Sequence, residues 1–250
     1  ETGSVTLDAA VLTSFISGER EKRRPVALSV IPARVAQAVL AIEDHRFYEH
    51  PGVDLIGTLG ALVTNMRGNR QYLAGGSTIT QQLVRNVFLP AFGKTLQEAR
   101  AKSVRRKFLE VFVSVVLTQR ASKEQILEMY LNEVPLGQRG SFAIFGVAEA
   151  ARLFFGKDVT NLTLAEAATI AGVIQSPSAL SPVGNPDRCL ERRNVVLRAM
   201  ADYEYVTARQ ADLAAKEPLG VVQRALEAEA PYFVDYVGQT LAAQYPGLTT

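Results

Sequence analysis

The chain has 250 residues, of which 48% are hydrophobic, and it carries 27 Lys and Arg against 25 Asp and Glu. This composition excludes a disordered or low-complexity protein, and the length is sufficient to bury a core without disulfides or structural metals. A single cysteine, Cys189, excludes an internal disulfide framework, and only two histidines accompany it, which argues against a His/Cys zinc site.

Helix-start signals recur along the chain, whereas the period-two alternation of strands is scarce. A Ser or Thr followed three residues later by Glu or Gln heads an apolar-periodic run at Thr78/Gln81, Thr95/Glu98, Ser122/Gln125, Thr163/Glu166 and Thr207/Gln210. Asp54 precedes a candidate helix over 55–66, a long helix is predicted over 95–118, and Asn185-Pro186 is typical of another helix start. The sequence therefore predicts a mostly helical fold.

The small net charge of +2 hides an uneven distribution. Residues 63–123 hold eleven Lys and Arg but only two acidic residues, so this segment carries +9 and the remainder −7. Such a block favours an anionic partner such as a phosphate, a nucleic acid or a lipid headgroup surface, although a solvated helix face is an alternative interpretation. No stretch approaches the about 18 apolar residues of a membrane-spanning helix.

A dense polar cluster extends from Glu43 to Gly52, directly after an apolar stretch. The negative charges of Glu43 and Asp44 lie at the C-terminal end of a helix, where they interact unfavourably with the helix dipole. Another role must therefore account for them. A carboxylate at the wall of a partly apolar cleft can act as a general base, and Phe47 and His50 could fix the turn beneath it. A charged helix end with a structural histidine explains the same residues, and spacing alone does not separate the two interpretations.

The segment from Gly75 to Gln82 joins a glycine pair to a helix N-terminus rich in hydroxyl and amide groups. Backbone N–H groups at such a start favour an anion, and Thr78 and Gln82 lie one turn apart on one helix face. The segment is not a P-loop, because no Gly-Lys-Ser/Thr sequence follows. A loop with an ordinary helix cap is the alternative interpretation.

Two later segments place carboxylates beside cations or amides. Arg106 and Lys107 stand four and three residues before Glu110, which would keep that carboxylate ionised among apolar neighbours. The segment 123–133 places a glutamate one helical turn before Asn132. A surface salt bridge and an amphipathic helix with a polar seam are the corresponding structural interpretations.

Taken in order, these segments resemble the signature blocks of the peptidoglycan glycosyltransferases, glycosyltransferase family 51, which form the N-terminal catalytic module of class A penicillin-binding proteins. The blocks stand here as Glu43 to His50, Gly75 to Gln82, Arg106 to Glu110 and Lys123 to Asn132. A fifth block, which supplies Arg139 and Lys157, departs from the family's pattern, because Phe145 stands before Gly146 where some relatives have Arg.

The resemblance implies an all-α, lysozyme-like glycosyltransferase fold with a large lobe and a smaller jaw lobe that faces the membrane. It also implies polymerisation of lipid II into glycan strands, with inversion at the anomeric carbon and release of undecaprenyl pyrophosphate. Glu43 would be the catalytic base and Glu110 the second essential carboxylate. The residues implied to bind substrate are Asp44, Phe47, His50, Thr78, Gln82, Arg85, Arg106, Lys107, Asn132, Arg139 and Lys157. Those expected to face the membrane are Phe88, Leu89 and Phe92.

Cations would neutralise the leaving pyrophosphate, so no cofactor and no protein metal site are expected, although Mg²⁺ or Mn²⁺ could assist. The implied partners are lipid II, the growing glycan strand, the membrane surface and regulators of cell-wall synthesis, and no nucleic acid is expected. Moenomycin, a phosphoglycolipid, is the expected inhibitor. The implied location is the periplasmic, extracytoplasmic face of the bacterial inner membrane, with anchoring by an N-terminal transmembrane helix that is absent from this sequence.

Three segments are expected along the chain. Residues 1–24 form a lead-in whose Glu1-Thr2-Gly3 is typical of residues added in cloning, and residues 25–218 form the glycosyltransferase domain. Residues 219–250 resemble the start of a linker toward a transpeptidase domain. No Ser-x-x-Lys or Lys-Thr-Gly sequence of such a domain occurs in this chain, so acylation by penicillin is not expected of it.

Two other functions stay open from the sequence. A lysozyme-like hydrolase or lytic transglycosylase would cut the same glycan, but it needs no cationic block for a pyrophosphate. A non-enzymatic helical module that binds nucleic acid or anionic membrane would leave Glu43, Asp44 and Glu110 unexplained within a cationic region. Analysis of the products distinguishes the first function from synthesis, and duplex binding with a steep salt dependence would identify the second.

Overall fold

The computed structural model describes residues 21–57, 76–91, 104–139, 142–222 and 239–240. The helices, in chain order, are α2 (Ala33–Glu43), α4 (Ile79–Leu83), the π-helix η1 (Val84–Phe88), α5 (Leu89–Ala91), α7 (Val104–Arg120), α8 (Lys123–Glu133), α9 (Val147–Phe155), the 3₁₀-helix η2 (Val159–Asn161), α10 (Leu164–Val173), α11 (Pro186–Asp202) and α12 (Ala208–Ala215). The strands are β1 (Glu21–Arg23), β2 (Pro135–Arg139) and β3 (Phe142–Phe145). The prediction of a mostly helical fold is confirmed.

The predicted helix starts form as expected wherever the structure describes them. Reciprocal capping boxes head α4, α8, α10 and α12, so that four of the five pairs found in the sequence close both hydrogen bonds. The fifth pair, Thr95/Glu98, lies outside the described residues, as does the start of the predicted helix 95–118. Pro186 opens α11 as predicted, but the Asn185 side chain donates to the carbonyl of Ser178 at 3.1 Å instead of capping the helix.

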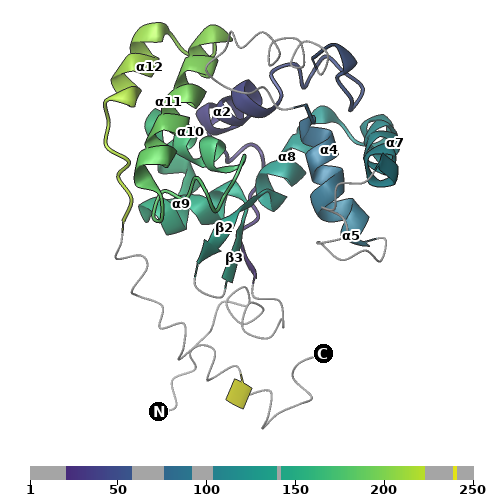
Figure 1. Ribbon diagram of the computed structural model, residues 1–250, viewed down its shortest axis with the longest axis horizontal. Coiled ribbons are helices and arrows are strands. Elements are labelled where there is room, and N and C mark those ends of the chain that lie inside the picture. The colour runs from purple at the N-terminus through teal and green to yellow at the C-terminus, as the bar shows by residue number, and fades with distance from the viewer. Residues whose placement is uncertain (1–20, 58–75, 92–103, 140–141, 223–238, 241–250) are drawn as a thin grey trace, which may run out of the picture.

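A small three-stranded sheet was not predicted. Its order is β1-β3-β2, with β1 parallel and β2 antiparallel to β3. Strands of three to five residues are too short to display an alternation of buried and exposed side chains, so the pattern that identifies strands is missing from the sequence. β2 and β3 directly follow α8, and they extend from the lower end of the helical body in Figure 1.

The main hydrophobic core holds the large lobe together around α10. Every residue from Ala165 to Val173 is buried, and α10 packs against α2 and α11 (Figure 1). Small residues permit this close approach: a Cβ on Gly172 would lie 3.1 Å from Cγ of Arg192 on α11. The C-terminal end of α2, which carries Glu43, is therefore held on a rigid support.

A second group of elements, α4, η1, α5 and α7, lies on the other side of α8 (Figure 1). It has its own small cluster, in which Val84 and Leu89 are buried beneath partly buried side chains of η1 and α7. The expectation that Leu89 faces the membrane is wrong, because Leu89 is only 2% exposed within this cluster. Phe88 is partly buried against the same cluster, and Phe92 lies outside the described residues.

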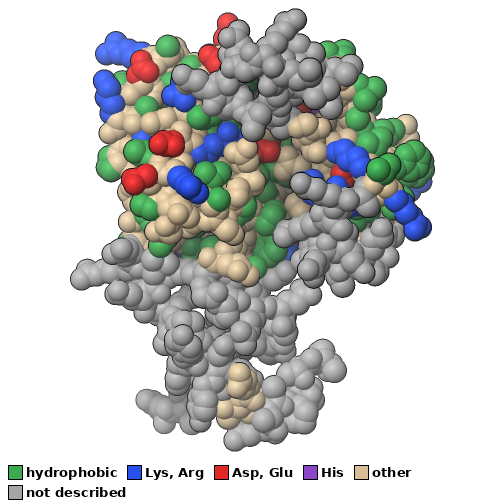
Figure 2. Space-filling model, in the orientation of Figure 1, with side chains coloured by type: hydrophobic (Ala, Val, Ile, Leu, Met, Phe, Trp, Pro, Cys, Tyr) green, Lys and Arg blue, Asp and Glu red, His purple; other side chains and the backbone are tan. Residues whose placement is uncertain are grey.

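A different apolar stripe is exposed on this small lobe. Val104, Phe108 and Phe112 on α7 are 89%, 70% and 59% exposed, and their spacing of four residues places them along one helix face. Figure 2 shows hydrophobic side chains gathered at the right of the molecule, where Figure 1 places α7, with Lys and Arg side chains beside them. None of the described helices is long and apolar enough to cross a bilayer.

The turn after the polar cluster is packed tightly against α7. Gly52 has φ +90°, and a Cβ there would lie 2.5 Å from the backbone oxygen of Ser114. We expect Gly52→Ala to lower the free energy of unfolding by roughly 3 kcal/mol, because positive-φ strain and a clash with backbone act together. Urea denaturation measures this change.

Gly156→Ala is the matched control, because Gly156 also has a positive φ, of 63°, but its Cβ would meet no heavy atom nearer than 3.9 Å. That substitution should cost only about 1 kcal/mol, the strain of a left-handed residue alone. Equal losses in the two variants would contradict the close packing of the turn against α7.

Candidate active site

Glu43 is the last residue of α2, and its side chain is partly buried between the two lobes. Gln82 Nε2 donates to Glu43 Oε2 at 2.8 Å, and the hydroxyl of Tyr130 donates to Gln82 Oε1 at 2.9 Å. Burial raises the pKa of the Glu43 carboxyl above its usual value, although the Gln82 hydrogen bond and the charges of Arg192 and Arg85 oppose the rise. A carboxyl with a raised pKa is a stronger proton acceptor once it is ionised.

Asp44 has a different role from its neighbour. Its carboxylate is 7% exposed and accepts from the backbone N–H of Ile79 at 3.0 Å and from His50 Nε2 at 3.0 Å. The sequence suggested a carboxylate at the unfavourable end of a helix, but Asp44 lies at the favourable N-terminal end of α4. The contacts of Asp44 and His50 thus join the turn after α2 to α4.

The same turn is fixed from below by α8. Phe47 is fully buried, and Lys123 Nζ lies 4.4 Å from its ring centroid. Lys123 also donates to the backbone carbonyls of Phe47 and His50. Thr78, predicted to contact substrate, donates its hydroxyl to the carbonyl of Gly52 at 2.7 Å and accepts from the backbone of its own helix. These contacts use the predicted binding groups to hold Glu43 in place.

Glu110 is fully buried on α7 and is held by two cations. Arg106 donates to Glu110 Oε1, and Lys107 Nζ lies 3.5 Å from Glu110 Oε2. Lys107 also donates to Ser77 Oγ at 2.9 Å and to Gln81 Oε1 at 3.1 Å, which connects α7 to the start of α4. Burial lowers the pKa of the Lys107 ammonium, and the neighbouring Glu110 charge opposes this effect.

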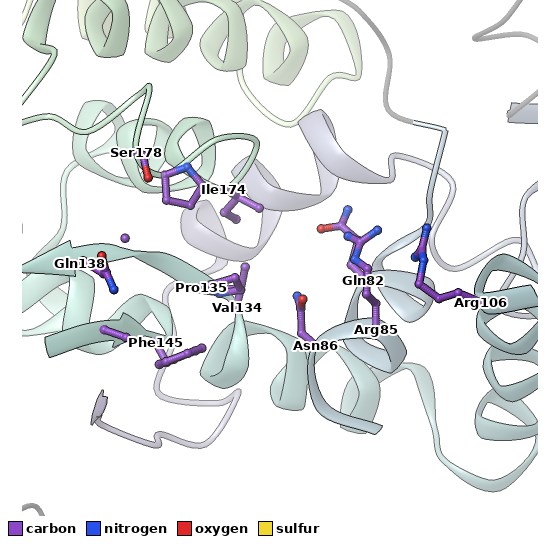
Figure 3. A pocket seen from close by; sticks show the side chains of 13 residues that line it. Gln82, Arg85, Asn86, Arg106, Val134, Pro135, Gln138, Phe145, Ile174 and Ser178 are labelled. Carbon is purple, nitrogen blue, oxygen red and sulfur yellow. The ribbon is translucent and has the colours of Figure 1, made fainter. Parts of the chain in front are cut away.

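A cleft of about 710 Å³ lies between the two groups of elements. Its described lining combines Gln82, Arg85, Asn86 and Arg106 on one side with residues of β2, β3 and the loop after α10 on the other (Figure 3). Neither Glu43 nor Glu110 lines it directly. Each is bonded to a residue that does, because Gln82 holds Glu43 and Arg106 holds Glu110.

The π-helix η1 supplies two of these lining side chains. Arg85 and Asn86 lie in its wider turn and face the cleft, and no hydrogen bond or ion pair joins their side chains to another residue in the described part of the chain (Figure 3). Single π-turns in helices often occur at functional sites. Arg85 and Asn86 are therefore available to a ligand, and Arg85 together with Arg106 makes this side of the cleft cationic.

Two predicted residues, Asn132 and Lys157, make their contacts elsewhere in the fold. Asn132 exchanges two hydrogen bonds of 2.9 Å with the backbone of Val26, so its amide is engaged with the segment before α2. Lys157 donates to Glu166 at 2.8 Å and is not among the described residues that line the cleft. Arg139 ends β2, opposite Phe142 of β3, and its side chain lies outside the described part of the structure.

Sequence reasoning missed several residues that the structure brings to this region. Arg192 on α11 lies close enough to Glu43 to lower its pKa, and Tyr130 reaches it through Gln82. Gln138 and Ser178 line the cleft opposite Arg106. The double arginine at 192 and 193 was the only local signal, and apolar periodicity had placed Tyr130 simply in the core.

Comparison with known proteins identifies the relatives of this chain. The family profile described as "Transglycosylase" matches residues 8–201. Penicillin-binding protein 1B of Haemophilus influenzae is 36% identical over 94% of this chain and 28% of its own length. Penicillin-binding protein 1A of Escherichia coli is 42% identical over 90% of this chain and 25% of its own length, and the protein of that name from Vibrio cholerae is 41% identical over 90% and 26%.

A solved structure supports the same relationship. The crystal structure of penicillin-binding protein 1A from Haemophilus influenzae superposes with a TM-score of 0.51 at 26% identity, covering 92% of this chain and 22% of that one. The present chain thus spans about a quarter of the length of the curated relatives that it matches.

Proposed function

The chain belongs to the transglycosylase family, and from that premise we propose that it is a peptidoglycan glycosyltransferase that polymerises lipid II into glycan strands. The observation that carries this proposal is the pair of separated carboxylates with unequal surroundings. Glu43 is bonded to an amide and has a raised pKa, whereas Glu110 lies between two cations. One carboxylate can accept a proton while the other organises positive charge.

The proposed reaction proceeds with inversion at the anomeric carbon of the donor. The 4-hydroxyl oxygen of the acceptor sugar forms the new glycosidic bond, and its proton passes to the Glu43 carboxylate. The bond between the anomeric carbon and the pyrophosphate oxygen breaks, and undecaprenyl pyrophosphate leaves with the electron pair. The Gln82 amide orients Glu43 for this transfer.

Positive side chains are proposed to stabilise the leaving pyrophosphate. Arg85 and Arg106 line the cleft, and Lys107 lies beside the Glu110 carboxylate that Arg106 also contacts. Fixed cations that face developing negative charge can supply several kcal/mol of transition-state stabilisation, on the order of 3 kcal/mol for each group. We propose that these cations suffice, so that Mg²⁺ or Mn²⁺ can assist the reaction but is not required.

The substrate and product carry polyprenyl chains, so we place the reaction at a membrane surface. The exposed stripe of Val104, Phe108 and Phe112 suits insertion into the headgroup region better than the buried Leu89 does. The proposed location is the periplasmic face of the bacterial inner membrane, and regulators of cell-wall synthesis are proposed as partners. Residues 25–218 would form the catalytic domain and residues 219–250 the start of a linker.

The deciding experiment incubates the purified chain with lipid II in detergent, with and without moenomycin. We expect long glycan strands and free undecaprenyl pyrophosphate, both suppressed by the inhibitor, and no requirement for added Mg²⁺. Release of muropeptides from finished peptidoglycan would instead identify a glycan-cleaving enzyme. Tight duplex binding without turnover of lipid II would identify a nucleic-acid-binding module.

A further inference from the structure

The hydrogen bond between Tyr130 and Gln82 lies directly behind the proposed catalytic base. Tyr130 is 1% exposed and comes from α8, and Gln82 is 9% exposed and comes from α4. The phenolic O–H donates to Gln82 Oε1, and Gln82 Nε2 donates to Glu43 Oε2. Three helices, α8, α4 and α2, therefore meet in one hydrogen-bonded chain that ends at the Glu43 carboxylate.

The series of hydrogen bonds from Tyr130 through Gln82 to Glu43 has a preferred donor-to-acceptor direction. An ionised carboxylate can only accept, so the Gln82 group that faces Glu43 should be the amide nitrogen. Burial raises the pKa of the Tyr130 phenol well above its usual value, so its oxygen keeps the proton and requires an acceptor. In the flipped amide, the Gln82 oxygen would face the carboxylate, and the Tyr130 hydroxyl hydrogen would be buried without a partner. Both ends of Gln82 thus favour the same orientation.

We propose that Tyr130 is a positioning residue for catalysis, which fixes the orientation of the Gln82 amide and so keeps a hydrogen-bond donor on the Glu43 carboxylate. This inference rests on the proposed function, because it assumes that Glu43 is the base. Without the hydroxyl, Gln82 loses one of the two partners that select its orientation, so its amide donor is held less firmly on the ionised carboxylate.

The consequence is a change in the pH dependence of the base. Other charged groups around Glu43 are Arg192 from α11, Arg85 from η1 and the adjacent Asp44. The two arginines lower the pKa of Glu43 and Asp44 raises it, and Tyr130→Phe leaves all three charges in place. Loss of the oriented donor removes one of the influences that lower this pKa, so the base would ionise at higher pH.

The test is Tyr130→Phe, which keeps the buried ring and removes only the hydroxyl. We expect the acidic limb of the pH profile of kcat to move to higher pH, so that kcat falls about tenfold on the acidic side. KM for lipid II should change little. Tyr48→Phe, at an exposed tyrosine of the neighbouring turn, should leave the profile unchanged. A purely structural Tyr130 would lower stability without moving the limb.

A double-mutant cycle checks that the effect passes through Gln82. In Gln82→Met, which removes both hydrogen bonds, the added Tyr130→Phe substitution should have no further effect on the acidic limb. An undiminished effect in that background would overturn the proposed route. An unchanged limb in Tyr130→Phe alone would overturn the positioning role itself.

A measurement without substrate separates this inference from the proposed function. The Glu43 carboxyl carbon can be titrated by ¹³C NMR, with Glu43→Gln to assign its signal, in the wild type and in Tyr130→Phe. The variant should titrate at higher pH, and coincident titration curves would overturn the positioning role. If the wild type fails to polymerise lipid II, the proposed function fails, while the titration still reports whether Tyr130 acts on Glu43.

Discussion

Glu43→Gln should reduce polymerisation of lipid II by about 10²–10⁴-fold, the range expected when a general base is removed. The substitution preserves shape, and the Gln82 Nε2 donor can still bond to the new side-chain oxygen, so binding of substrate should persist. The loss should therefore appear in kcat more than in KM. Gel analysis of glycan length and the rate of lipid II consumption measure it.

The stability of this variant should change in the opposite direction from its activity. The folded-state pKa of Glu43 lies above its unfolded value, so the native state binds the proton more tightly. The free energy of unfolding of the wild type therefore decreases as the pH rises from the unfolded-state pKa through the folded-state pKa of Glu43. Glu43→Gln has no ionisable group at this position, so it does not show this decrease. Calorimetry from acid to neutral pH should show the variant gaining Tm relative to the wild type.

Glu49→Gln is the matched control for both measurements. Glu49 lies in the same turn, but its side chain is 62% exposed and pairs with Arg46 on the surface. Activity should stay near that of the wild type, and stability should change by less than about 1 kcal/mol. Substantial polymerisation by Glu43→Gln would remove Glu43 as the base, and a similar loss in Glu49→Gln would show that the turn as a whole had been disturbed.

Glu110→Gln should reduce both activity and stability. The carboxylate is 0% exposed and is paired with Arg106, whose side chain is 12% exposed, so its neutralisation breaks a buried ion pair. Breaking a buried ion pair in this way costs about 3–5 kcal/mol. The proposed pyrophosphate ligands would also lose their anchor, with an expected fall in kcat of about 10²–10³-fold. Urea denaturation and the lipid II assay measure the two effects.

Glu124→Gln supplies the same chemical change at an exposed site in the first turn of α8, and it should leave both properties nearly unchanged. The comparison with Glu43→Gln is the more informative one. Both carboxylate variants are expected to lose at least about 10²-fold in activity, but only Glu110→Gln should be destabilised. A stable Glu110→Gln protein would mean that Arg106 and Lys107 are held by something other than this carboxylate.

The helix starts could be predicted from the sequence because each depends on residues only three positions apart. A capping box such as Thr78/Gln81 is complete within one turn, so its pattern is visible without knowledge of the fold. The burial of Leu89 could not be predicted in this way, because it depends on residues that are distant in sequence. Its hydrophobic neighbours suggested a membrane-facing surface, whereas packing against α7 buries it and leaves Phe108 and Phe112 exposed instead.

Asn132 and Thr78 show the same limit within the predicted site. Their side chains were expected to contact substrate, but they bind the backbone of segments that are distant in sequence. A hydrogen-bonding side chain does not reveal its partner from sequence alone, because a sugar and a peptide carbonyl demand the same donor. Thr78 fixes the turn that follows Glu43, and Asn132 fixes the segment that precedes α2.

The amino-acid sequence by itself determined the helical class of this protein, the family to which it belongs and the two carboxylates that are proposed for its site. These follow from composition, short-range caps and ordered motifs, which are properties of neighbouring residues. Only the tertiary structure decided how the carboxylates differ. Glu43 bonds to Gln82, 39 residues away in sequence, and through Gln82 to Tyr130, a further 48 residues along the chain. Glu110 pairs instead with Arg106 of its own helix. Burial of each carboxylate arises from tertiary packing, and the unequal surroundings support the proposal that one carboxylate accepts a proton and the other organises cations.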